Sequence, residues 1–150
     1  MKNREDAMAY LDCDERFATG IPSIDYEHRR LVDLVNNLDL LIADGASAQS
    51  IAANLAEFHA LATAHFALEE RIMQALRHSR YQYCRDEHYR LLDEVRDIME
   101  EYERGVFEPL ARLPAALKDW LCGLMNIDAE MFAGLDEATL KTWHLSRTRH

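Results

Sequence analysis

Apolar residues recur every three or four positions over four long stretches of the chain, which is the spacing of one face of an α-helix. The helices predicted in this way cover residues 24–43, 47 or 50 to about 78, 83–104, and 114 to about 134. Ser23 is expected to cap the first helix, and Pro114 to stand in the first turn of the fourth. Four amphipathic helices with short links predict an all-α fold, an up-down-up-down four-helix bundle with a short N-terminal arm and a C-terminal helical tail.

The two ends of the chain have weaker patterns. The first 20 residues suggest an irregular arm, and residues 137–147 suggest a short, weakly amphipathic fifth helix. We therefore expect a bundle domain over 1–135 and a helical tail or connector over 136–150. Whether that last segment docks on the bundle or leads to something further on stays open at this point.

Composition narrows the class of protein. The chain has 150 residues, 49% of them hydrophobic, with only 5 glycines and 3 prolines, as expected for one helical domain with short loops. Its formal net charge of −10 argues against nonspecific nucleic-acid binding, which needs a basic surface. No apolar run is long enough to cross a membrane or to form a secretion signal, and the cysteine count of 3 is odd. We expect a cytoplasmic protein with reduced thiols.

Each predicted helix carries polar residues on its apolar face. These residues are His28 in the first helix, His65 and Glu69 in the second, His88 in the third and Asp128 in the fourth. A buried carboxylate is costly unless it is paired or binds a cation. Taken singly, each of these residues could be an ordinary hydrogen-bonded core residue. Taken together, they predict a metal site at the bundle axis, with donor atoms that suit iron, zinc or manganese.

Two sequence motifs carry a family resemblance. The segments Thr19–Leu31 and His65–Glu70, which read TGIPSIDYEHRRL and HFALEE, together with His88, Trp120-Leu121 and Asp128, resemble the hemerythrin family, and bacterial hemerythrins in particular. The resemblance covers roughly residues 8 to 133.

The resemblance implies a non-haem di-iron centre in a four-helix bundle. Its cofactor would be two iron ions joined by an oxo or hydroxo bridge and two bridging carboxylates, with dioxygen as the ligand. The metal ligands implied in this sequence are His28, His65, Glu69, His88 and Asp128. Phe66 and Trp120 are expected to line the pocket around the site.

The chain departs from the family pattern at two ligand positions. Cys84 stands where the family has a histidine four residues before His88, and the fourth helix has no histidine near Leu124. Asp128 also lies one residue closer to Trp120 than the family motif expects, and Ala129, at the ungapped position, cannot bind metal. One iron would therefore keep His28 and His65, and the other would keep His88 alone.

The residues near the two missing histidines leave alternatives open. Cys84 is either a thiolate ligand or a small apolar filler, and Leu124 and Met125 lie near the missing histidine of the fourth helix. Cys13 and Cys122 are expected to be structural.

The leading functional interpretation is a sensor module for dioxygen, nitric oxide or redox state, attached to a signalling output domain downstream. Whether it forms a homodimer stays open at this point. A free-standing oxygen carrier or storage protein is the main alternative. A di-iron oxidase or peroxidase is less favoured, because the Glu-x-x-His pairs of ferritin-like oxidases are absent from the site faces. A bundle that has lost its metal and serves only in partner contact is the remaining class. We expect no enzymatic activity.

Overall fold

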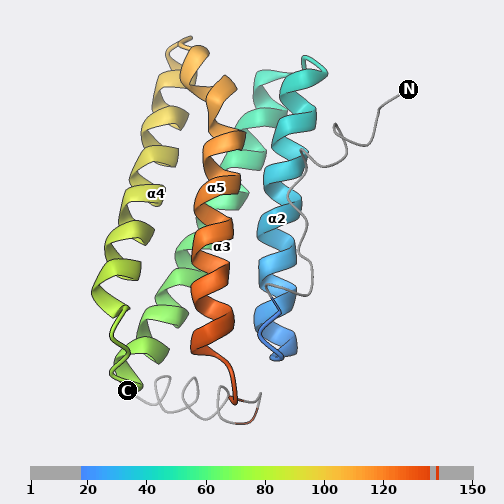
Figure 1. Ribbon diagram of the computed structural model, residues 1–150. Helices are drawn as coiled ribbons and strands as arrows, with labels where there is room; N and C mark the ends of the chain where they lie inside the picture. Colours follow the sequence, from blue (N-terminus) through green and yellow to red (C-terminus); the bar gives the residue numbers. More distant parts are fainter. Residues whose placement is uncertain (1–17, 136–137, 139–150) are drawn as a thin grey trace.

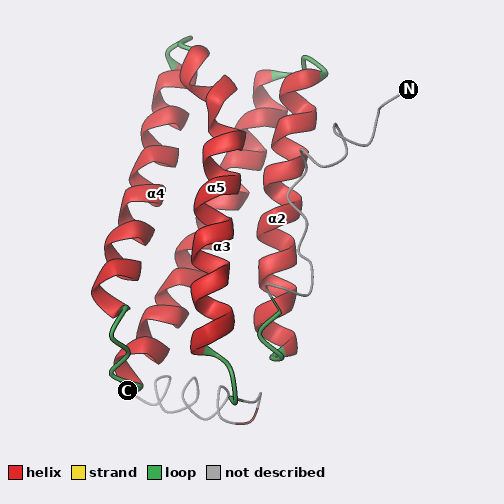
Figure 2. Cartoon of the chain, viewed as in Figure 1, coloured by secondary structure: helices red, strands yellow, loops and turns green. Residues whose placement is uncertain are grey.

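The structure, a computed structural model, describes residues 18–135 and residue 138. Within these residues the chain forms four helices and no strand: α2 (Pro22–Ala43), α3 (Ala48–Ala75), α4 (Tyr81–Glu103) and α5 (Glu108–Met131). Successive helices run in opposite directions, as Figures 1 and 2 show. The predicted up-down-up-down bundle is therefore confirmed. The expected N-terminal arm and the fifth helix over 137–147 lie outside the described residues, apart from Ala138.

The helices form a four-cornered bundle in which each packs mainly against two others. α2 and α4 occupy opposite corners, and each contacts both α3 and α5. Two ion pairs join neighbouring helices on the outside: Arg30 with Glu57 at 2.8 Å, and Lys118 with Asp39 at 2.9 Å. Such surface pairs contribute about 0–1 kcal/mol each, so the bundle depends on its apolar interior. None of the described helices is long and apolar enough to cross a membrane.

The apolar interior is divided into two clusters. The large cluster fills most of the bundle, and it includes Leu31, Phe66, Leu91, Leu124 and Met125. The small cluster lies towards the end of the bundle where α2 begins, and it includes Ile24, Met73, Cys84, Ile127 and Met131.

A layer of buried polar residues lies between the two clusters. His28 follows Ile24 and precedes Leu31 on α2, and Asp128 lies between Met125 and Met131 on α5. Because every helix passes from one cluster to the other at the same height, the predicted polar positions of all four helices meet in one layer. The alignment follows from the antiparallel packing.

The start of α2 differs from the sequence prediction. The helix begins at Pro22, Ile21 is the N-cap, and no side chain caps it there, so the expected cap by Ser23 is wrong. The preceding turn is fastened by Asp25, whose Oδ1 accepts hydrogen bonds from the backbone N–H and the hydroxyl of Thr19 at 2.9 and 2.8 Å. The proline fixes the backbone for the first helical turn, which explains why the helix can start before the serine.

The start of α5 also differs. The helix begins at Glu108, and Pro109 occupies its first turn, whereas Pro114 lies inside the helix. The prediction that Pro114 opens this helix is therefore wrong. Pro114 is buried near the N-terminal end of the helix. Proline has no backbone N–H to donate to the preceding turn. Only a short part of the helix lies before this missing hydrogen bond.

Three helices end in the same kind of turn, with a residue in the left-handed conformation. Gly45 and Gly105 have φ values of 67° and 88°, which glycine adopts without steric penalty. Arg77 takes the equivalent place after α3 with φ 52°, and the next residue, His78, donates its N–H to the carbonyl of Met73 at 2.9 Å. The helix therefore ends at Ala75 rather than at the predicted position near His78.

Candidate metal centre

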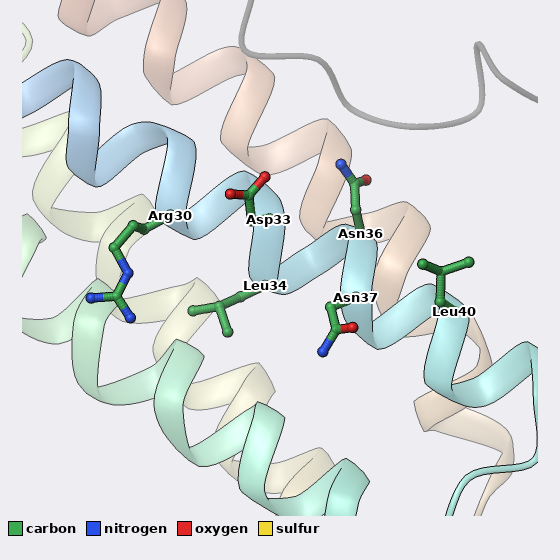
Figure 3. Close-up of a pocket in the computed structure, with 6 residues that line it drawn as sticks. All are labelled: Arg30, Asp33, Leu34, Asn36, Asn37 and Leu40. Carbon is green, nitrogen blue, oxygen red and sulfur yellow. The ribbon is translucent and has the colours of Figure 1, made fainter.

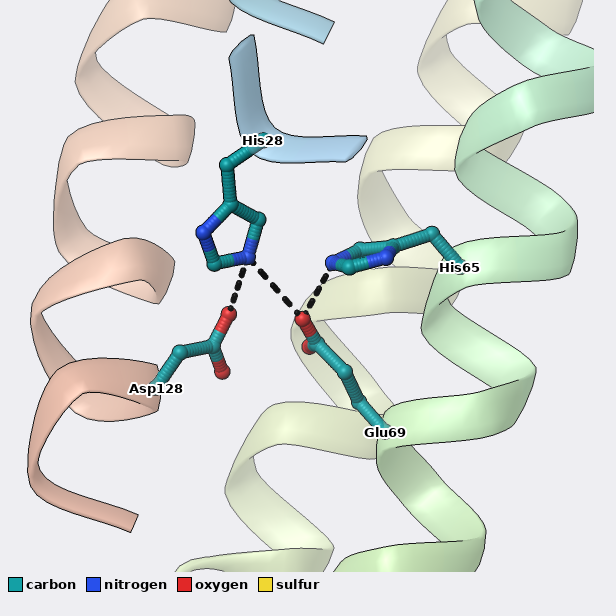
Figure 4. A group of neighbouring side chains, drawn as sticks. All are labelled: His28, His65, Glu69 and Asp128. Carbon is teal, nitrogen blue, oxygen red and sulfur yellow. Dashed lines mark hydrogen bonds and ion pairs between the residues drawn. The ribbon is translucent and has the colours of Figure 1, made fainter. Parts of the chain in front are cut away.

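Four of the predicted site residues meet at the bundle axis. His28, His65, Glu69 and Asp128 each offer a ligand atom, and these atoms all lie within 4.8 Å of one another. Figure 4 shows the two histidines and the two carboxylates converging from α2, α3 and α5. All four residues are buried, with at most 3% of their surface exposed. The choice of Asp128 over Ala129 thus agrees with where the structure places the carboxylate.

The contacts within this group are short. His28 Nε2 lies 3.1 Å from Asp128 Oδ2 and 3.4 Å from Glu69 Oε1. His65 Nε2 lies 2.5 Å from the same Glu69 oxygen, across one helical turn. The rings of His28 and His65 meet edge to face at 4.8 Å. Two imidazole nitrogens and two carboxylate groups therefore face a common point.

His88 faces the second oxygen of Glu69. Its Nε2 lies 3.6 Å from Glu69 Oε2, whereas the histidines of α2 and α3 face Oε1. His88 is not among the four residues whose ligand atoms cluster most tightly. The two oxygens of Glu69 thus divide the site into two halves, the first with His28 and His65 and the second with His88. A carboxylate placed in this way can bridge two cations.

Two further glutamates hold the outer nitrogens of the histidines. Glu27 Oε1 lies 2.5 Å from Nδ1 of His65, and Glu70 Oε2 lies 2.9 Å from Nδ1 of His88. When a histidine binds metal through Nε2, a carboxylate on Nδ1 fixes its tautomer and ring orientation. Neither glutamate is among the site residues predicted from the sequence. The available signal was their position: Glu27 directly precedes His28, and Glu70 directly follows Glu69.

The remaining predicted site residues lie around this centre in different ways. Phe66 stacks flat on the ring of His88, with the ring centroids 3.9 Å apart. Leu124 and Met125 are buried in the large cluster, and Trp120 is only half-buried at the edge of the same cluster. Cys84 is buried in the small cluster, one helical turn before His88.

Burial and charge oppose each other at the two histidines of the first half. Burial lowers the pKa of His28, but its hydrogen bonds to Asp128 and Glu69 outweigh burial and raise the pKa to about 9. Burial likewise lowers the pKa of His65, and the charge of Glu69 with the hydrogen bond to Glu27 raises it to about 10. Without metal, both imidazoles therefore hold protons at neutral pH.

The two carboxylates are shifted in opposite directions. Burial raises the pKa of both, but the charge of His65 and the hydrogen bond from His28 bring the pKa of Glu69 well below its usual range. Burial and the negative charge of Glu69 together keep the pKa of Asp128 well above its usual range. The site thus brings together imidazole and carboxylate groups that bind cations, and protons occupy these groups when no metal ion is bound.

Unsatisfied polar atoms show that the site fits a metal ion. Nε2 of His88 and Oε2 of Glu69 are both buried without a hydrogen-bond partner. Buried polar atoms normally have such partners, and each unpaired one needs an explanation. These two atoms lie 3.6 Å apart, and a cation bound between them would coordinate both. The donors, imidazole nitrogen and carboxylate oxygen, suit divalent iron, zinc or manganese.

A surface hollow on α2 lies away from this centre. It has a volume of about 480 Å³ and is lined by α2 residues Arg30, Asp33, Leu34, Asn36, Asn37 and Leu40. Figure 3 shows these side chains spread along α2. The hollow shares no residue with the metal centre and has none of its buried, convergent polar atoms.

The fold and site together define a class: four-helix-bundle proteins that hold cations between inward-facing histidines and carboxylates. Within that class, the family model described as Hemerythrin HHE cation binding domain matches residues 19–135. The chain therefore belongs to the hemerythrin family, and the resemblance seen in its motifs is confirmed. No curated protein sequence and no solved structure gives a significant match to this chain.

Proposed function

We propose that this chain binds two iron ions and uses them to bind dioxygen or nitric oxide, as a sensor module that reports ligand or redox state to a signalling output domain. The first ion would lie between His28, His65, Glu69 and Asp128, and the second between His88 and the far oxygen of Glu69. The observation that carries this proposal is the placement of Glu69, whose two oxygens face the histidines of different halves.

The residues of the chain have separate tasks in this proposal. Bound iron would supply a redox-active centre able to coordinate a small diatomic ligand. Glu27 and Glu70 orient His65 and His88 through their Nδ1 atoms. Phe66 covers one face of His88, and the surrounding clusters exclude water from the polar layer. A dry site strengthens the interaction between the buried carboxylates and a cation.

The unequal halves favour sensing over bulk carriage. In the second half, Leu124 provides no donor atom, and His88 is the only imidazole among the described residues that faces Glu69 Oε2. A metal ion with fewer protein ligands is held less tightly and leaves room for exchange of exogenous ligands. Ready exchange suits a switch. A free-standing carrier would need to release the ligand reversibly, without leaving the metal in its oxidised state.

Spectroscopy of the iron-loaded protein tests this proposal. The reduced protein is prepared without oxygen, its iron content is measured, and ultraviolet-visible spectra are recorded before and after exposure to air or nitric oxide. We expect about two irons per chain and new absorption bands of an oxo-bridged ferric pair or a nitrosyl adduct. A spectrum unchanged by both gases would contradict ligand binding, and steady product formation from peroxide would instead indicate an oxidase or peroxidase.

A further inference from the structure

A cysteine lies on the same helix as His88, the histidine of the second half of the centre. Cys84 lies on α4 one helical turn before His88, so the two side chains share a helix face. Only 1% of Cys84 is exposed, and it forms no disulfide. Its surroundings in the small cluster are aliphatic and aromatic side chains. The thiol is therefore held in a dry environment, close to the layer that contains the metal ligands.

The charges of two site carboxylates act on the Cys84 thiol. Burial raises the pKa of its thiol to about 12, and the negative charges of Asp128 and Glu69 contribute to the increase. These two residues come from α5 and α3, so the sulfur lies within electrostatic reach of both carboxylates from a third helix. A cation placed among the three groups would reverse the effect of those charges and favour the thiolate.

Two buried atoms of the second half, one on His88 and one on Glu69, independently point to a ligand. Nε2 of His88 and Oε2 of Glu69 make no hydrogen bond, and both residues are 1% exposed. They lie 3.6 Å apart, too far to bond each other but suitable for sharing a cation. If Cys84 were only a filler, the second half of the centre would have one imidazole and the carboxylate oxygens as donors.

We propose that Cys84 is a metal ligand, and that Cys84, His88 and Glu69 form a nitrogen-sulfur-oxygen site chemically different from the nitrogen-oxygen site of His28 and His65. This inference rests on the proposed two-metal centre but does not depend on iron being the metal. On binding, the S–H bond breaks, the proton passes to solvent, and a sulfur lone pair forms the bond to the metal, with no change of oxidation state. Thiolate selects zinc, cobalt or ferrous iron over magnesium and calcium.

Cobalt titration of the metal-free protein tests the assignment. Cobalt bound by thiolate shows a sulfur-to-metal charge-transfer band in the near ultraviolet, and cobalt bound by nitrogen and oxygen alone does not. We expect the wild type to bind two cobalt ions and to show this band. Cys84→Ala should abolish the band and reduce the affinity for the second ion by at least roughly tenfold. That is the loss expected when only the hydrogen-bond partner of a metal ligand is removed. The variant should also release one proton fewer than the wild type when the second ion binds.

The matched control is Cys122→Ala. Cys122 is half-buried on α5 and packs against the large cluster, away from Cys84, so its replacement should leave the band unchanged. Because alanine removes only the sulfur from an apolar setting, we expect Cys84→Ala to fold, and circular dichroism checks this. Two cobalt ions without the band, or a band that persists in Cys84→Ala, would overturn the thiolate ligand and leave the two-metal centre standing. Fewer than two cobalt ions in the wild type would overturn both.

Discussion

The ring of Phe66 lies parallel to the ring of His88, with an interplanar angle of 0° and centroids 3.9 Å apart. The two residues come from neighbouring helices, α3 and α4, and Phe66 directly follows the ligand His65 in sequence. His88 is held by this stack on one side and by Glu70 on its outer nitrogen. The position of the imidazole is therefore set before any metal ion binds.

Replacing Phe66 with leucine should weaken the second metal ion selectively. The substitution removes the stacking partner of His88 and leaves a smaller side chain beside the imidazole. We expect about a tenfold loss of affinity for the second ion, with the first ion held as in the wild type. Isothermal titration with a divalent metal measures both affinities. Phe58→Leu, at a buried position of the large cluster on the same helix, is the control for general loss of packing; an equal effect of both substitutions would contradict a specific role for Phe66.

The outer carboxylates should act on separate halves of the centre. Glu27→Gln removes the charge from the partner of His65, and Glu70→Gln does the same for His88. Loss of such a partner reduces metal affinity by about 10- to 100-fold. We expect the first substitution to weaken the ion at His65 and the second to weaken the ion at His88, as resolved by a stepwise metal titration. A uniform effect of either substitution on both ions would show that the halves are not independent.

The metal-free protein should lose stability as the pH rises from about 7 to 10. The pKa values of His28 and His65 in the folded chain are raised from 6.5 to about 9 and about 10. The folded state thus holds these protons more tightly than the unfolded state, and the stabilisation is complete below pH 6.5 and lost through pH 9 to 10. The raised pKa of Asp128 likewise gives a stabilisation that is lost as the pH rises. The lowered pKa of Glu69 has the opposite effect: it stabilises the folded state above the ordinary pKa of a glutamate, and this stabilisation is lost on acidification.

Urea unfolding at several pH values measures this effect. We expect a falling free energy of unfolding in the metal-free protein and a flatter profile in the metal-loaded protein, whose ligand nitrogens carry no proton to lose. His65→Gln should flatten the profile of the metal-free protein, and His78→Gln, in the turn after α3, should not. A metal-free profile that rises from pH 7 to 10 would contradict the assigned protonation states.

A single substitution in the turn after α3 should raise the stability of the protein. Arg77 adopts φ 52°, a left-handed conformation that is unfavourable for any residue with a Cβ atom. Replacing it with glycine should raise the free energy of unfolding by about 0.5–1 kcal/mol. The reciprocal change, Gly45→Ala, should lower it by about 1 kcal/mol, because an added Cβ meets no neighbouring atom there and only the backbone is strained. Thermal and urea unfolding of both variants check the signs.

The sequence predicts the bundle well because a period of three to four residues, sustained over many turns, specifies a helix face. The same pattern does not specify where a helix begins, as Pro114 shows. A proline is favoured in a first turn, but two prolines stand near the start of α5, and Pro109 takes that place while Pro114 is buried further along. Local preference alone could not rank the two, since the choice depends on how far α5 must extend to cover the large cluster.

The site was predictable to the extent that its residues break the apolar pattern. His28, His65, Glu69, His88 and Asp128 interrupt apolar faces, and the structure brings all five into one layer. Glu27 and Glu70 were missed because they interrupt nothing: each is only partly buried, and their role depends on which ring nitrogen of a histidine from another helix they meet.

Iron content of the anaerobically loaded protein tests the central claim, that Glu69 joins two metal positions. We predict about two irons per wild-type chain after removal of loosely bound metal. Glu69→Gln should retain no more than one, because an amide cannot bridge two cations as a carboxylate does. Glu57→Gln, an exposed position on the same helix, should retain two. A wild-type chain that holds one iron or none, or a Glu69→Gln variant that holds two as tightly as the wild type, would contradict the claim.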